Sequence, residues 1–183
     1  MYRLETERLI IRRWKLSDSA DHFEYAESEL VGPNAGWKPL TSEEQSKSFI
    51  KWFMTCDYVY AIELKENNKV IGGIGINEKF PNPSIVDMKQ RQIDYDLNPQ
   101  YWGRGLVPEA VNRLIKFGFE EMNLDIIWCN HYEENYNSRR VNEKCGFKYQ
   151  FTKEEVLDQF DNKKVNTLYY RIDRMTYDKP ITS

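Results

Sequence analysis

The feature that most constrains this chain is a short loop with two glycines, set between a strand-like run and a helix-like run. Residues 93–97 alternate polar and apolar side chains as a strand does, and residues 110–119 place apolar side chains at helical spacing. Gly103 and Gly105 lie between them. Glycines let successive backbone N–H groups point in one direction, and the start of a helix adds positive potential. The sequence therefore predicts an anion site at this loop.

The spacing of the glycines excludes the two common nucleotide loops. A dinucleotide-binding loop requires a third glycine, and a P-loop requires Gly-Lys followed by Ser or Thr. Instead, Gln100 precedes the glycines in the pattern Q-x-x-G-x-G. This pattern resembles the coenzyme A pyrophosphate loop of the GNAT acyltransferase superfamily.

A second segment strengthens the resemblance. Residues 135–147 read N-Y-N-S-R-R-V-N-E-K-C-G-F. They are similar to the N-x-x-S…E-K-x-G-F signature of one GNAT branch, the ribosomal-protein N-terminal acetyltransferases. Residues 4–12 also resemble the opening strand of that branch. Two ordered motifs at family spacing are more specific than either alone, so the resemblance runs from the first residues to the last strand.

Composition is compatible with a single globular domain over residues 1–183, with 40% apolar and 30% charged residues. The net charge of −3 gives no reason to propose nucleic acid as a partner. We expect no membrane span and no secretory signal, because no apolar run is long enough. Cys56, Cys129 and Cys145 are far apart and only two histidines exist, so we expect core cysteines, no metal site and a cytoplasmic location.

The pattern along the chain predicts a mixed α/β (α+β) fold, because early hairpins give way to strand–helix–strand units. We expect strands at 8–14, 58–64, 69–76, 90–97, 125–130, 147–152 and 167–172. We expect helices from the Ser17-Asp18 cap to about Leu30, from Thr41 to about Cys56, over 104–122 and over 138–144, the last closed by Gly146. Residues 31–39 are predicted to be a loop, and 153–164 an irregular or helical insertion.

The resemblance implies a mixed, largely antiparallel sheet that splays at the cofactor site and is flanked by helices. It also implies acetyl-CoA as the cofactor, with its pantetheine arm held by backbone groups of Tyr95 and Leu97 and by Asn135 on the opposite wall. The cofactor phosphates would bind to the backbone of the glycine loop, with Arg104 as a charge partner. The loop residues are Trp102, Gly103, Arg104, Gly105, Leu106 and Val107. Trp102 has a second interpretation, as a packing residue at the base of the loop.

Acyl transfer to an amine requires a donor for the departing thiolate and a route for the amine proton. The resembled branch offers Ser138 as the donor, which the sequence alone would interpret as a helix cap. Tyr136 is the alternative donor.

Candidate bases are Glu78 and either Asp94 or Asp96, although a water chain would suffice for an α-amine, whose pKa is about 7.7–8.0. The family often carries a glutamate near Gln92, and this difference leaves the base open. His131 and Glu133 rank lower.

The acceptor pocket is expected between the 31–39 loop and the hairpin, with Trp37 either shaping a slot for the amine or covering the core. The acceptor would be a protein N-terminal α-amine, a polyamine, an aminoglycoside or another small amine. A non-catalytic acyl-CoA sensor would share every cofactor residue, and a nucleotide-dependent α/β enzyme is a third alternative. A homodimer is left open.

Overall fold

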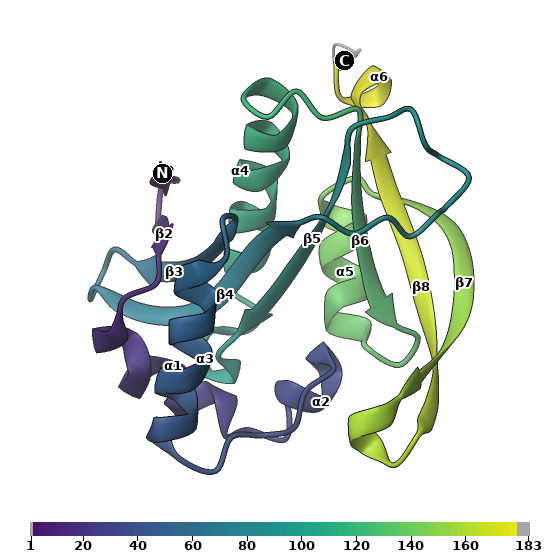
Figure 1. The fold of residues 1–183 in the computed structure, drawn as a ribbon. Helices are drawn as coiled ribbons and strands as arrows, with labels where there is room; N and C mark the ends of the chain where they lie inside the picture. Colours follow the sequence, from purple (N-terminus) through teal and green to yellow (C-terminus); the bar gives the residue numbers. More distant parts are fainter. Residues whose placement is uncertain (1, 179–183) are drawn as a thin grey trace.

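The protein is described by a computed structural model that covers residues 2–178. Within that range an eight-stranded sheet has the spatial order β1-β2-β3-β4-β5-β6-β8-β7 (Figure 1). All neighbouring strands are antiparallel except β5 and β6, which are parallel. The predicted mixed α/β fold is therefore confirmed. The strands are β1 (Leu4–Glu5), β2 (Leu9–Arg13), β3 (Val59–Leu64), β4 (Lys69–Asn77), β5 (Gln90–Leu97), β6 (Ile126–Tyr132), β7 (Lys148–Leu157) and β8 (Lys163–Asp173).

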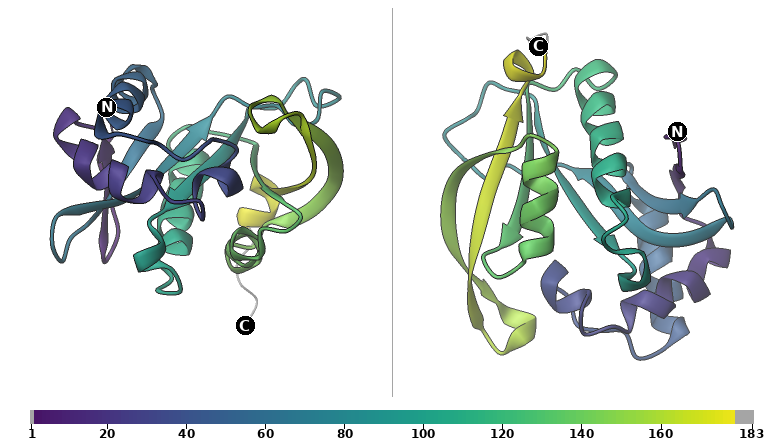
Figure 2. Two further views of the ribbon diagram at one scale, coloured as in Figure 1. Left: turned by 90° about the horizontal axis from the view of Figure 1, so that it is seen from below. Right: turned by 180° about the vertical axis from the view of Figure 1, so that it is seen from behind.

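Helices cover both faces of this sheet. Figure 1 shows α1 and α3 in front of the first half of the sheet, and Figure 2 shows α4 and α5 against the opposite face. The helices are α1 (Ser19–Ala26), α2 (Gly32–Ala35), α3 (Glu43–Thr55), α4 (Leu106–Glu120), α5 (Tyr136–Lys144) and α6 (Arg174–Tyr177). Short 3-10 turns lie at Leu16–Asp18, Pro99–Tyr101 and Asp158–Phe160.

The main core lies between α4 and the sheet. Helix α4 presents an apolar face at helical spacing, including Leu106, Ala110, Leu114 and Phe117, all of which are buried. They join the buried side chains of β2 to β6 in one cluster. Full burial of one such large side chain stabilises the fold by about 1.5–3 kcal/mol. This packing fixes the start of α4, and hence the glycine loop, at the end of β5.

Within the first 40 residues, two predictions differ from the structure. Helix α1 ends at Ala26 rather than near Leu30, and the segment predicted as a loop at 31–39 contains the short helix α2. The left-handed Gly36, with φ of 86°, ends α2 as its C-cap. The predicted start of α3 near Thr41 is confirmed, and its cap is Ser42, whose Oγ accepts a hydrogen bond from the Gln45 amide.

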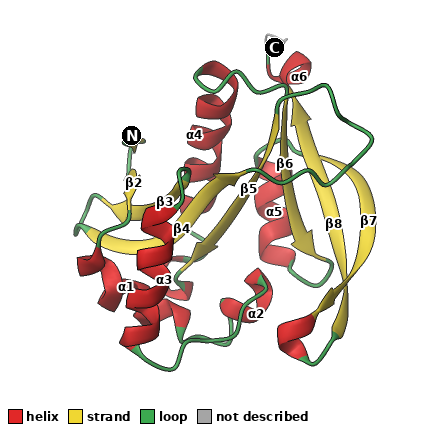
Figure 3. Ribbon diagram, viewed as in Figure 1, coloured by secondary structure: helices red, strands yellow, loops and turns green. Residues whose placement is uncertain are grey.

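The predicted insertion at 153–164 is wrong. The structure instead continues β7 and β8 as a long hairpin, seen as two yellow arrows in Figure 3. Its outer part is mostly polar, with an ion pair of 2.9 Å between Lys164 Nζ and Glu154 Oε1, so hydrophobic alternation did not reveal it. Asp161 and Asn162 both have positive φ, which Asp and Asn tolerate better than most residues, and they let the chain reverse.

Candidate active site

The glycine loop after β5 has a backbone that only glycine adopts easily. Gly103 and Gly105 have φ values of 75° and 74°, in the left-handed region. A Cβ at Gly103 would meet no atom within 4 Å, and one at Gly105 would meet only Arg8 Nη2, at 3.7 Å. The glycines are therefore required by the backbone turn, and the space above them is open.

This turn leaves a row of backbone amides without partners. Within residues 2–178, the amides of residues 103–107 donate no hydrogen bond, and the last two belong to the first turn of α4. The Trp102 amide donates to Pro99 O, so it does not belong to this row. The Trp102 indole donates to Leu97 O at 2.9 Å, which agrees with the interpretation of Trp102 as a packing residue at the loop base. Unpaired amides at a helix start are a ready site for phosphate.

Two side chains that are far from each other in sequence hold the loop in place. Arg8 donates through Nη1 to Arg104 O at 2.9 Å and through Nε to Glu109 Oε2 at 2.7 Å. Glu109, in the first turn of α4, also accepts from the Arg8 amide and from Thr6 Oγ1. Sequence reasoning missed both Arg8 and Glu109. The one available signal was Arg8 in the opening segment that resembles the family.

The two other polar residues of the motif contact neighbouring side chains. The Arg104 guanidinium lies over the Tyr101 ring, 5.4 Å from its centroid, and 3.5 Å from Glu66 Oε2. Arg104 is nearly half exposed, so the guanidinium is able to move to an anion. Gln100 Nε2 lies 3.4 Å from Glu24 Oε1, which ties the loop to α1.

Strands β5 and β6 separate next to the loop. They pair only from Gln90 with Ile126 to Ile93 with Cys129. Beyond these pairs, residues 94–97 of β5 pair with β4 alone, and residues 130–132 of β6 pair with β8 alone. The expected splay is therefore present, and it leaves a gap lined by backbone on both sides.

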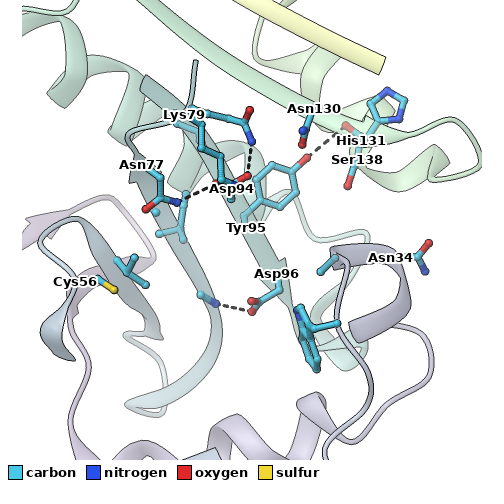
Figure 4. A pocket seen from close by; sticks show the side chains of 18 of the residues that line it. Asn34, Cys56, Asn77, Lys79, Asp94, Tyr95, Asp96, Asn130, His131 and Ser138 are labelled. Atoms are coloured by element: carbon cyan, nitrogen blue, oxygen red, sulfur yellow. Dashed lines mark hydrogen bonds and ion pairs between the residues drawn. The ribbon is translucent and has the colours of Figure 1, made fainter. Parts of the chain in front are cut away.

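A cavity of about 1010 Å³ occupies the region around this gap. Figure 4 shows Asp94 and Asp96 from β5 on one side and Ser138 of α5 on the other. The Tyr95 hydroxyl lies 3.4 Å from Ser138 O, and the Tyr95 ring packs against the core beneath α4 and α5. Successive strand residues point to opposite faces. The two aspartates and Tyr95 therefore line the cavity from opposite faces of β5.

The predicted bases Asp94 and Glu78 each form an ion pair with a basic side chain. Asp94 Oδ2 accepts from Asn77 Nδ2 at 2.8 Å and pairs with Lys79 Nζ at 2.9 Å. Asp94 Oδ1 accepts from Gln92 Nε2 at 2.6 Å, so Gln92 holds this carboxylate. Glu78 pairs with Arg91 and is 68% exposed, at the edge of the cavity.

Asp96 differs from both. Within residues 2–178 it forms no ion pair, and its Oδ1 accepts from the Gly73 amide at 2.8 Å. Burial raises the pKa of Asp96 to about 6, although the hydrogen bond from Gly73 acts in the opposite direction. Such a carboxylate is charged at neutral pH and accepts a proton more readily than an ordinary aspartate.

The second motif forms the wall across the gap. Helix α5 begins at Tyr136, two residues before the predicted start, and its cap is Asn135, whose Oδ1 accepts from the Ser138 amide at 3.1 Å. The interpretation of Ser138 as the cap is therefore wrong, and its hydroxyl is free of that role. Ser138 lines the cavity, whereas Tyr136 is exposed and does not.

The sequence matches the family model for an acetyltransferase (GNAT) domain over residues 8–148. The chain belongs to the GNAT acetyltransferases. It is 29% identical over 171 residues to the uncharacterized N-acetyltransferase p20 of Bacillus licheniformis, covering 90% of each chain. Its fold is similar to that of a GNAT-family acetyltransferase from Bacillus anthracis, with a TM-score of 0.82, 26% identity and coverage of 94% of this chain and 98% of that one.

Two more distant structures share the fold. The ribosomal-protein-S5-alanine acetyltransferase of Vibrio fischeri has a TM-score of 0.73 at 20% identity, with 98% of this chain and 100% of that chain covered. The microcin C7 self-immunity acetyltransferase MccE, solved in complex with acetyl-CoA and AMP, has a TM-score of 0.77 at 18% identity, with 92% and 93% covered. The predicted resemblance to GNAT enzymes, ribosomal-protein acetyltransferases among them, is confirmed.

The remaining predicted residues of this GNAT site occupy two walls. Trp37 packs on the cluster of Tyr25, Val31 and Leu40, which confirms that it covers the core; it also lines the cavity, and its part in shaping a slot for the amine stays a prediction. His131 lines the cavity, and its buried Nε2 has no partner within residues 2–178. Burial lowers the pKa of His131, so its neutral form is favoured. Glu133 accepts from Asn166 outside this cavity.

Among residues 2–178, no helix is long and apolar enough to cross a membrane. In the same range, no three His, Cys, Asp or Glu side chains are grouped so that they could hold a metal ion.

Proposed function

We propose that this GNAT acetyltransferase transfers an acetyl group from acetyl-CoA to a primary amine by direct attack of the amine on the thioester. The observation that carries the proposal is the row of free amides at residues 103–107, placed at the end of a strand gap that opens into a cavity with an unpaired carboxylate. Free amides bind phosphates, a strand gap can hold the extended pantetheine arm, and a carboxylate binds an ammonium group.

The residues of the loop and gap fit coenzyme A. The amides of Gly103, Arg104, Gly105, Leu106 and Val107 would hold the diphosphate, with Arg104 as a mobile charge partner. The unpaired side of β5 at Tyr95 and Leu97 would bind the pantetheine arm as an added strand. Leu97 O already accepts from Trp102, which leaves the other backbone groups of this segment for the arm. Asn135 faces the arm across the gap.

The bound cofactor supplies the acyl group, since a C–N bond to the amine forms as the C–S bond of the thioester breaks. Asp96 holds the ammonium form of the acceptor and takes its proton, which then passes to solvent. The Ser138 hydroxyl donates its proton to the departing sulfur. The second proton that the nitrogen loses then replaces it on the hydroxyl. The overall products are the amide, the free thiol and one proton.

Asp94 and Glu78, the carboxylates predicted as bases, take supporting roles in this scheme. Asp94 is held by Lys79, Asn77 and Gln92, so its oxygens have little capacity to bind a further proton donor. Glu78 lies at the solvent end of the cavity with Arg91. Of these three candidate bases, Asp96 is the one without a cation within residues 2–178, and we therefore assign the proton to it.

Steady-state release of free thiol from acetyl-CoA in the presence of amines tests the function. We expect turnover with at least one primary amine and a product that carries one added acetyl group by mass spectrometry. Tight coenzyme A binding without turnover for protein N-termini, polyamines, aminoglycosides and arylalkylamines would contradict catalysis and favour the non-catalytic sensor.

A further inference from the structure

The cavity continues from Asp96 toward α1 and α3, on the side away from the cofactor gap. Gly73 lies at the start of this extension. A Cβ on Gly73 would lie 3.3 Å from Asp96 Oδ2 and 3.3 Å from Trp14 Cζ2. The carboxylate and the edge of the indole therefore come together over this glycine, and a larger residue would push them apart.

Aromatic rings lead outward from that point. Trp14 packs on Phe53 at a centroid distance of 5.3 Å, and Phe53 contacts Trp52 at 5.3 Å and Phe49 at 6.2 Å. All four line the cavity. Trp14 is 3% exposed whereas Trp52 is 59% exposed, so this aromatic ladder (Trp14, Phe53, Trp52 and Phe49) runs from the half-buried Asp96 carboxylate to solvent.

Three of the four ladder residues lie on one face of α3. Phe49, Trp52, Phe53 and Cys56 occupy positions i, i+3, i+4 and i+7, which place them on one side of a helix. The core requires only part of this face, because Ile50 and the half-buried Phe53 pack against Trp14 while the Trp52 ring stays in solvent. Exposed aromatic rings beside a cavity mark a binding surface.

The wall of the cavity that carries the aromatic ladder has no charged side chain of its own. The cavity-lining residues between Trp14 and Val59 include no Lys, Arg, Asp or Glu. His22 is the one titratable imidazole among them, and burial lowers its pKa to about 4, so it is neutral at pH 7. Asp96 is therefore the single charge at the inner end of an uncharged aromatic wall, which suits an acceptor with one ammonium group and a flat apolar body.

We propose that the acceptor is a primary amine joined by a short linker to an aromatic ring, with its ammonium group on Asp96 and its ring against Trp52 and Phe53. This inference rests on the proposed acetyltransferase function. Polyamines and aminoglycosides carry several positive charges, and the other carboxylates of the cavity, Glu78, Asp94 and Glu155, lie outside this wall. An alanine N-terminus has no ring for the ladder.

The test compares amines that differ in one feature, with the full chain and acetyl-CoA. The panel is 2-phenylethylamine, 2-cyclohexylethylamine, butylamine, spermidine and an alanyl peptide. We expect 2-phenylethylamine to have the highest kcat/KM, roughly tenfold above butylamine, from aromatic stacking and added apolar contact. A higher kcat/KM for 2-phenylethylamine than for 2-cyclohexylethylamine would show that ring stacking contributes beyond the buried apolar area.

The Trp52→Ala variant tests whether the Trp52 ring causes the preference for 2-phenylethylamine. The side chain is mostly exposed, so the fold should survive, and we expect a roughly tenfold lower kcat/KM for 2-phenylethylamine, through KM, with butylamine unchanged. Met54→Ala is the matched control, because Met54 is exposed on the same helix and does not line the cavity. Turnover confined to spermidine or the alanyl peptide, or an equal effect of Trp52→Ala on every amine, would overturn this inference alone. No turnover with any amine would overturn the proposed function with it.

Discussion

At the scale of single residues, Asp94 and Asp96 differ in what surrounds them rather than in type. Asp94 and Asp96 are two residues apart on β5 and point to the same face, yet Asp94 meets three side-chain donors, whereas Asp96 meets the Gly73 amide and lies beside the Tyr25 hydroxyl. Sequence analysis named both as candidates and had no means to rank them. The partners Asn77, Lys79 and Gly73 come from β4 and the segment after it. The register between β4 and β5 therefore determines which aspartate has which partners.

Asp96→Asn should separate function from stability. The folded pKa of Asp96, about 6, lies above the ordinary aspartate value of 3.8. The folded state therefore binds the proton more tightly, and the stability associated with Asp96 is complete below pH 3.8 and lost as pH rises through about 6. We expect the asparagine variant to be more stable than wild type at pH 7.5, by on the order of 1–2 kcal/mol, and to lose this advantage near pH 4.

Thermal melts at both pH values measure this difference, and the same samples serve for activity. Removal of a base typically costs about 10²–10⁴ in rate, so the more stable variant should be the less active one. An asparagine variant with full activity at pH 7.5 would exclude Asp96 as the proton acceptor, whatever its effect on the melting temperature.

Ser138→Ala tests the donor to the departing sulfur. The hydroxyl lines the cavity and does not cap α5, so its loss should leave the helix intact. We expect kcat to fall by about 10-fold or more, while the dissociation constant of coenzyme A changes by less than about threefold. Equal kcat in the two proteins, by thiol release, would leave Ser138 with no part in the chemistry.

At the scale of elements, the loop depends on a strand that is remote in sequence. Arg8, just before β2, contacts both Arg104 O and Glu109, so the opening segment holds the loop in the shape that exposes its amides. Local patterns predicted the loop and the start of α4, because glycine spacing and helical periodicity are short-range signals. The Arg8–Glu109 contact joins residues 101 positions apart, and no local pattern reports such a contact.

Arg8→Ala should loosen the loop without unfolding the protein. Arg8 is more than a third exposed, so most of its effect should fall on the cofactor site. We expect the dissociation constant of coenzyme A to rise about 10-fold, which corresponds to about 1.4 kcal/mol. Arg3→Ala is the control, since the exposed Arg3 pairs only with its neighbour Glu5. Similar coenzyme A affinities for the two variants, measured by calorimetry, would show that the loop holds its shape unaided.

At the scale of the whole molecule, the sheet is one continuous layer that opens at a single place. The sequence predicted the mixed sheet and, through the family resemblance, its splay. It did not predict the β7–β8 hairpin beyond 152, since a solvated two-stranded ribbon needs no apolar alternation. The acceptor wall was predicted only through Trp37, because Trp14, Phe49 and Phe53 carry no motif and meet the cavity only when α3 packs over β3 and β4.

The proposed acetyl transfer requires that the amides of the glycine loop bind the cofactor diphosphate. Gly105→Glu would place a carboxylate over this row, whereas Gly146→Glu makes the same change at another left-handed glycine, with φ of 80° and open space around its Cβ. Both variants carry the same backbone strain and the same added charge. Calorimetric titration with coenzyme A should show tight binding to wild type and to Gly146→Glu, and none to Gly105→Glu. Binding to Gly105→Glu with the affinity of Gly146→Glu would contradict the account.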